Sequence, residues 1–176
     1  MLTLQITDKD LFDEGTEQFL TVKGATVDME HSLASLSKWE AKYKKPWFGK
    51  DGFSMSTSEL LDYFQMMCLS HCDPAVFKFM NQDEVNIVGE YMNDSQTATW
   101  FGHRDEPSGK GRVITAELVY YWMISLKIPF EAENWNINRL FTLIQVCTEE
   151  STPKKNTMTP ADRARLNKER LAKFGG

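Results

Sequence analysis

The sequence predicts an α+β fold that is predominantly α-helical. A small N-terminal antiparallel β-hairpin or sheet packs on a helical bundle, and a basic helix ends the chain. Two observations carry this prediction. In residues 1–31, apolar and polar side chains alternate with the period of two that a half-buried strand requires. In residues 32–151, apolar residues instead recur at the three- and four-residue spacing of amphipathic helices.

The strand prediction begins with apolar residues that alternate with polar ones at Leu2, Leu4 and Ile6. The segment 8–17 is polar and acidic, so we expect it to be a connection. Lys23-Gly24 separates the β-prone residues 19–22 and 27–29, which predicts a hairpin between those two runs. A sheet of two or three strands is only marginally stable alone. We therefore expect the following helices to cover it.

Helices are predicted over 32–44, from the Ser56–Glu59 capping-box pattern to about residue 68, briefly at 74–80, and from Asn81 to about Met92. Lys45-Pro46 ends the first of them, because a residue before proline is disfavoured in helical conformation. Residues 93–112 form a long irregular connection. Within it, the β-prone stretch Thr97–Phe101 could pair with the N-terminal sheet.

The strongest helical pattern is an aromatic helical hairpin from Ile114 to Cys147. Its first helix, 114–126, is apolar on nearly all sides, which places it in a core or at an interface. Pro129 ends that helix, and an amphipathic helix follows from about Asn134. A short connection makes consecutive helices antiparallel neighbours.

The charge distribution divides the chain in two. Residues 152–176 hold seven basic and two acidic residues, whereas 1–151 holds 13 basic and 23 acidic residues. We therefore predict one globular domain at 1–151 (β-rich at 1–31, helical at 32–151) and a basic tail at 152–176 with a helix at 160–174. The net charge of −5 argues against general nucleic-acid binding.

Composition also predicts where the protein works. No run of about 18 apolar residues occurs, so we expect no membrane span. The first ten residues lack the features of a signal peptide. Three cysteines without regular spacing (Cys68, Cys72 and Cys147) are typical of free thiols in a reducing cytoplasm.

No residue pattern indicates catalysis, a metal or a cofactor. Cys68, His71 and Cys72 share one helix face, but structural zinc needs four ligands and no second Cys or His pair completes the set. Gly109-Lys-Gly111 lacks the strand before it and the Gly-Lys-Ser/Thr ending of a phosphate loop. The carboxylate pairs Asp83-Glu84 and Glu131/Glu133 fall in or near predicted first turns, where they complement the helix dipole. We expect a non-enzymatic protein.

Two features are candidates for partner binding. The aromatic group of the hairpin is mainly core, but one small domain cannot bury every ring, and tyrosine and tryptophan are enriched at interfaces. The basic tail could dock on an acidic protein surface, pack on its own body or, less favourably, bind nucleic acid. The candidate residues are Tyr120, Trp122, Trp135, Arg139, Lys154, Lys155, Arg163, Arg165 and Arg170.

In sequence order, several blocks of the chain resemble tail assembly chaperones of long-tailed, siphovirus-type bacteriophages. The blocks are His31–Phe48, Leu60–Tyr63, Thr97–Phe101, Ile114–Met123, Ile128–Glu131, Trp135–Leu140, Met158–Pro160 and Leu166–Arg170. Together they span nearly the whole chain. The family pattern would place His and Leu within Asn136-Ile137-Asn138, which weakens the case that these side chains touch a partner.

The resemblance implies a non-virion factor in the host cytoplasm during infection. Such a chaperone would coat the phage tape-measure protein while tail-tube protein assembles around it. The family commonly adds a longer isoform made by frameshifting, and a homo-oligomer is possible. The resemblance supplies no catalytic or cofactor-binding residues. Alternatives are a structural tail, neck or baseplate component and, less favourably, a nucleic-acid-binding regulatory protein.

Overall fold

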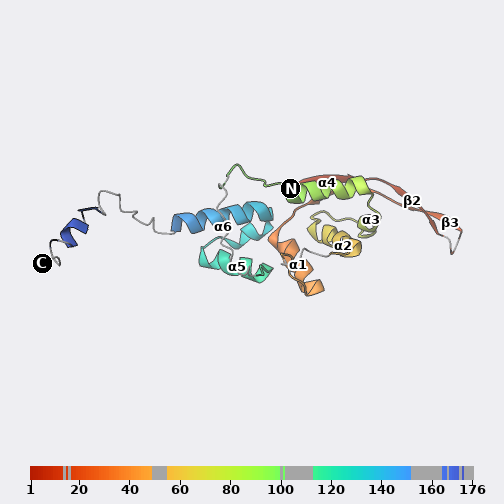
Figure 1. Cartoon of the computed structure of the whole chain (residues 1–176). Helices are drawn as coiled ribbons and strands as arrows, with labels where there is room; N and C mark the ends of the chain where they lie inside the picture. The colour runs from red at the N-terminus through yellow and green to blue at the C-terminus, as the bar shows by residue number, and fades with distance from the viewer. Residues whose placement is uncertain are drawn as a thin grey trace.

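A computed structural model describes residues 1–13, 15, 17–48, 55–99, 101, 113–151, 164–165, 167–170 and 172. It confirms an α+β fold that is mostly helical, with antiparallel strands at the N-terminus (Figure 1). Its strands are β1 (Leu2–Ile6), β2 (Lys9–Asp13), β3 (Gln18–Val22) and β4 (Ala25–Met29). Its helices are α1 (Leu33–Tyr43), α2 (Thr57–Met67), α3 (Ala75–Lys78), α4 (Gln82–Asn93), α5 (Ala116–Ser125), η1 (Phe130–Asn134) and α6 (Ile137–Ser151).

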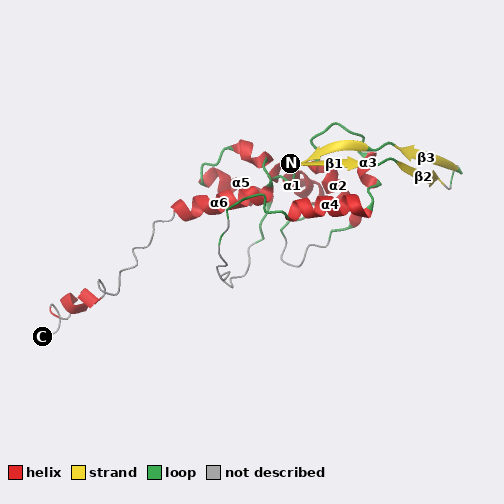
Figure 2. Cartoon of the chain, turned by 90° about the horizontal axis from the view of Figure 1, so that it is seen from above, coloured by secondary structure: helices red, strands yellow, loops and turns green. Residues whose placement is uncertain are grey.

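The strands pair differently from the prediction. β1 pairs with β4 and β2 pairs with β3, both antiparallel, so the predicted hairpin of 19–22 with 27–29 is wrong. The segment 8–17, predicted to be a connection, contains β2. Figures 1 and 2 show that β2 and β3 extend beyond the helices. The alternation rule missed β2 because most of its residues are polar, as an exposed strand allows.

The chain bends where β1 passes into β2 and β3 into β4. A Cβ atom on Gly24 would lie 2.1 Å from the carbonyl oxygen of Ile6, so only glycine allows this close approach. The Glu84 carboxylate accepts hydrogen bonds from the Thr7 backbone N–H and the Lys9 ammonium, each at 3.0 Å. Helix α4 therefore holds the bend in place.

Three of the described helices, α1, α2 and α4, begin with capping boxes. Capping boxes join Ser32 with Ser35, Ser56 with Glu59 and Asn81 with Glu84, satisfying backbone N–H groups at the starts of α1, α2 and α4. Lys44 ends α1 in a left-handed conformation. The described residues of Thr97–Phe101 are not in a strand, so that prediction is wrong for them.

The core lies where the β1–β4 pair, α1, α2 and α5 meet. Its largest fully buried side chains are Trp39, Tyr63, Phe64, Phe77, Met29, Leu33, Leu36, Met67, Met123, Ile137, Leu140 and Val27. The predicted aromatic hairpin needs a partial correction: the principal backbone contacts of α5 are with α1, and η1 stands between α5 and α6 in sequence. The predicted tail helix is helical at its described residues, 164–165, 167–170 and 172.

Candidate partner-binding surface

Tyr120 joins α5 to η1. Its hydroxyl donates a hydrogen bond of 2.7 Å to Glu133, and its ring centroid is 6.3 Å from that of Phe130. Burial, and then the hydrogen bond to Glu133, raise the pKa of Tyr120. Tyr120 therefore stays a neutral donor that fixes η1 against α5, and it is only half-exposed.

Trp135 and Arg139 form a second contact among the predicted partner-binding residues. The Arg139 guanidinium carbon lies 4.8 Å from the Trp135 ring centroid, within the range of a cation–π contact. Trp135 is 40% exposed at the end of η1, one residue before the buried Asn136. The structure thus brings these two predicted residues together at the surface.

Trp122, also a predicted partner residue, is half-buried and packs against the hydrophobic core. The outward positions of α5 are instead Tyr121 and Ile124, which are 62% and 60% exposed. Helix α5 buries Leu118, Val119 and Met123 and leaves the opposite face apolar. Of the residues of α5, the predicted Tyr120 and Trp122 are thus less exposed than Tyr121 and Ile124.

Four large apolar side chains between the middle of α5 and the start of α6 are therefore exposed. We call them the aromatic surface: Tyr121, Ile124, Phe130 and Trp135. The i, i+3 spacing of Tyr121 and Ile124 makes them neighbours on one helix face. That spacing was readable in the sequence, but nothing in an all-apolar helix indicated which side would face outward.

A second exposed aromatic pair lies on the β2–β3 ribbon. Phe12 and Phe19 face each other across the two strands, with ring centroids 5.2 Å apart, and are 54% and 75% exposed. This ribbon lies at the opposite end of the molecule from α5 and α6 (Figure 2). Sequence reasoning missed the pair because it assigned Phe12 to a connection.

The basic tail residues are only partly described. Arg165 and Arg170 lie in helical backbone and are exposed, and Arg165 pairs with Glu169 at 3.3 Å. Lys154, Lys155 and Arg163 lie outside the described residues. Within the described part of the chain, no hydrogen bond or ion pair joins Arg165 or Arg170 to an exposed aromatic side chain of α5 or η1. The structure therefore does not join Arg165 and Arg170, the two described tail candidates, to the aromatic residues.

A buried polar cluster links elements that are distant in sequence. Glu30 accepts hydrogen bonds from Tyr91 at 2.5 Å and Asn136 at 3.3 Å. Next to it, His31 Nδ1 lies 2.5 Å from the Tyr63 hydroxyl oxygen. Burial lowers the pKa of His31 to about 4, so its ring is neutral at pH 7. Since His31 is 4% exposed and Tyr63 fully buried, the pair joins β4, α1 and α2 and is not open to a substrate.

The cysteine-rich end of α2 offers little reactive chemistry. The sulfur atoms of Cys68 and Cys72 are 3.6 Å apart, and burial raises the pKa of the Cys68 thiol to about 11. A thiol with such a pKa is protonated at pH 7 and is therefore a poor nucleophile. Across the described ranges, no three His, Cys, Asp or Glu side chains are grouped to hold a metal ion.

Within the same ranges, no helix combines the length and the apolar character that crossing a membrane requires. No protein-family model matches the chain, and no curated protein or solved structure is significantly similar to it.

Proposed function

We propose that this protein is a non-enzymatic tail assembly chaperone of a long-tailed bacteriophage that binds the tape-measure protein during tail-tube assembly. The observation that supports the proposal is the exposure of the aromatic surface, Tyr121, Ile124, Phe130 and Trp135. The ordered blocks that resemble this chaperone family add the identity of the partner. Its expected place of action is the host cytoplasm.

The chemistry of the surface suits a helical client. An unassembled long helical protein exposes apolar stripes, and a binding protein must cover them without reacting with them. Exposed tyrosine and tryptophan bury large areas with few rotatable bonds, so they bind at a low cost in side-chain entropy. The Arg139–Trp135 pair adds a cation that can meet carboxylates at the edge of such a stripe.

Co-expression with the tape-measure protein tests the proposal. We expect the soluble fraction of the tape-measure protein to increase several-fold and a complex of the two proteins to survive size-exclusion chromatography. If the tape-measure protein is equally insoluble with and without this chain, and no complex forms, the proposal is wrong.

Mass spectrometry of purified virions separates the proposal from its structural alternative. An assembly chaperone leaves the particle, so we expect peptides of this chain in infected-cell lysate and none in purified virions. A constant number of copies per virion would instead identify a neck, tail or baseplate component.

A further inference from the structure

Two cysteines lie side by side where helix α2 ends. The sulfur atoms of Cys68 and Cys72 are 3.6 Å apart, whereas the two sulfur atoms of a disulfide are about 2.05 Å apart. A shift of about 1.5 Å in the sulfur positions would therefore bring them to bonding distance. Both cysteines are partly exposed, and Leu69 and His71 between them are exposed. A small molecule in solution can thus reach the pair.

The backbone before Cys72 is held against strand β4. The Met67 carbonyl oxygen accepts a hydrogen bond of 2.9 Å from the Glu30 N–H. The Leu69 N–H donates a hydrogen bond of 2.7 Å to the Asp28 carbonyl oxygen. Cys68 stands between these two contacts. Its position is therefore set by the sheet as well as by helix α2.

The backbone after Cys72 is held as well. Asp73 accepts the Ala75 N–H with its carboxylate at 2.9 Å and the Val76 N–H with its carbonyl oxygen at 3.2 Å. Val76 is buried in the hydrophobic core. Cys72 lies one residue before this turn. Both ends of the segment 68–72 are therefore anchored, so the short distance between the thiols is a property of the folded chain.

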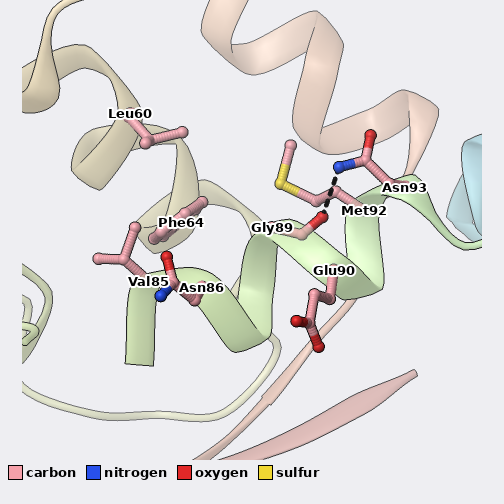
Figure 3. A pocket seen from close by; sticks show the side chains of 8 residues that line it. All are labelled: Leu60, Phe64, Val85, Asn86, Gly89, Glu90, Met92 and Asn93. Carbon is pink, nitrogen blue, oxygen red and sulfur yellow. Dashed lines mark hydrogen bonds between the residues drawn. The ribbon is translucent and has the colours of Figure 1, made fainter. Parts of the chain in front are cut away.

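Helix α2 is packed firmly as far as its last turn. Its Phe64 is 1% exposed and, together with Leu60, lines a cavity of about 420 Å³ between α2 and α4 (Figure 3). Cys68 follows Phe64 by four residues, which is about one helical turn. Among the described residues that line this cavity, neither Cys68 nor Cys72 occurs. The helix thus carries Cys68 to a defined place at its end, outside the cavity.

Cys68 is poorly suited to attack an oxidant first. Burial, and then the neighbouring Cys72 sulfur, raise the pKa of the Cys68 thiol to about 11. The thiolate is the form that attacks a disulfide. We therefore assign the first attack to Cys72 and the closing step to Cys68. Once Cys72 carries an adduct, its sulfur holds no charge, so one cause of the raised pKa of Cys68 is removed.

We propose that Cys68 and Cys72 form a reversible disulfide by exchange with a low-molecular-weight disulfide. The Cys72 thiolate attacks one sulfur of that molecule and displaces its other half as a thiolate. The Cys68 thiolate then attacks the Cys72 sulfur and displaces the second half. Two electrons pass from the cysteines to the small disulfide, and the two protons of the protein thiols go to the two released thiols. This disulfide is inferred independently of the proposed function.

The disulfide and the fold stabilise each other. Since the folded chain holds the two sulfur atoms close together, the disulfide forms more readily in the folded chain than in the unfolded one. By thermodynamic linkage, the disulfide then favours folding by the same factor. The bond ties the segment that pairs with β4 to the turn before α3.

Oxidised glutathione and the full-length Cys147→Ser chain test the inference. Trypsin leaves both thiols in one peptide, because no lysine or arginine lies between Lys50 and Lys78. After oxidation of the folded chain, we expect this peptide to be about 2 Da lighter, from the loss of two hydrogen atoms, and to resist iodoacetamide. Two glutathione adducts on the peptide, two thiols that stay reduced, or a disulfide between two chains would overturn the inference.

The wild type supplies an internal comparison. Cys147 lies on α6 and is partly exposed, like the two cysteines of the pair. We expect Cys147 to keep a single glutathione adduct under the conditions in which the pair closes. A disulfide between Cys147 and either cysteine of the pair would contradict the proposal.

A titration with different ratios of reduced to oxidised glutathione measures how strongly the fold favours the bond. The result is the effective concentration of one thiol near the other. We expect it to be at least tenfold higher in the folded chain than in about 8 M urea. Equal values would show that spacing in the sequence alone brings the thiols together, and would overturn the claim that the fold positions them.

Single replacements in the Cys147→Ser chain test the order of attack. Cys68→Ser should accumulate one glutathione adduct at Cys72, since no second thiol closes the bond. Cys72→Ser should form its adduct at Cys68 at least tenfold more slowly at pH 7, because that thiol is protonated. The opposite order of rates would overturn the assigned sequence of steps. Circular dichroism verifies that both variants are folded.

Discussion

The buried polar side chains and the exposed apolar side chains of this molecule differ in whether they have partners within the described chain. Among the described residues, no buried side-chain nitrogen or oxygen lacks a hydrogen-bond partner. Glu40, for example, accepts the backbone N–H of Trp47 at 2.6 Å with one oxygen and that of Ala116 at 2.8 Å with the other. The aromatic surface, by contrast, is left uncovered. Within the part of the chain that the structure describes, the buried polar side chains are hydrogen-bonded, whereas these four apolar side chains are exposed.

The largest loss of stability is expected when a buried carboxylate that joins two parts of the chain is removed. Glu40→Ala leaves two backbone N–H groups without their acceptor, one at the first residue of α5 and one after the end of α1. Hydrogen bonds to a charged group are worth more than neutral ones, so we expect a loss of about 3 kcal/mol in the free energy of unfolding. Urea denaturation measures it. Glu90→Ala, at an exposed carboxylate, should change the same quantity by less than about 0.5 kcal/mol.

The buried histidine makes the interior sensitive to pH. The pKa of His31 is about 4 in the folded protein against an ordinary value of 6.5. Between these values the unfolded chain binds the proton and the folded chain does not, so stability falls as pH falls through this window. We expect His31 to account for a loss of about 2 kcal/mol between pH 7.5 and pH 5.

Urea denaturation at several pH values measures this dependence. His31→Gln should reduce the slope between pH 6.5 and pH 5, whereas His71→Gln, at an exposed histidine, should leave it unchanged. An identical slope in His31→Gln and the wild type would show that the proton binds elsewhere.

Gly24, at the bend before β4, and Gly89, in helix α4, give opposite expectations for substitution by alanine. Gly89→Ala should raise the free energy of unfolding by about 0.5–1 kcal/mol, because the added methyl group meets open space and alanine favours the helix. Gly24→Ala should lower it, since the same methyl group would collide with the Ile6 carbonyl. Thermal denaturation of both variants measures these two changes in stability. Destabilisation by Gly89→Ala would mean that the added methyl group does not meet open space.

The smallest effect on stability is expected at the aromatic surface. Tyr121→Ser with Ile124→Ser removes side chains that are already 62% and 60% exposed, so we expect a change in unfolding free energy within about 0.5 kcal/mol per residue. Urea denaturation measures this as well. A loss as large as that of Glu40→Ala would show that these side chains stabilise the fold and would remove the contrast between interior and exterior.

Local signals in the sequence predicted most of the helices. Capping at Ser56 and Asn81 and the break at Pro46 depend on neighbours a few residues away, so the sequence places them well. The strand pairing was predicted wrongly, because β1 and β4 meet across an inserted hairpin and alternation does not encode which strands pair.

Which side chains of the candidate surface are exposed depends on contacts between residues far apart in the sequence. Tyr120 and Trp122 lie in the predicted helix, but the side of α5 that faces outward depends on its contact with α1, about 80 residues earlier in the chain. The contacts of Glu30 with Tyr91 and Asn136 likewise join residues far apart in sequence. Rules based on residue spacing describe near neighbours in the sequence, so they do not predict such long-range contacts.

The most direct test of the account replaces the aromatic surface and measures client binding. Full-length chain carrying Tyr121→Ser, Ile124→Ser and Phe130→Ser would be co-expressed with the tape-measure protein, beside a control carrying Lys38→Ser, Glu117→Ser and Glu131→Ser at exposed polar positions. We predict that the control retains as much tape-measure protein as the wild type, and that the first variant stays folded but retains less than a tenth. Equal retention by both variants would contradict the account.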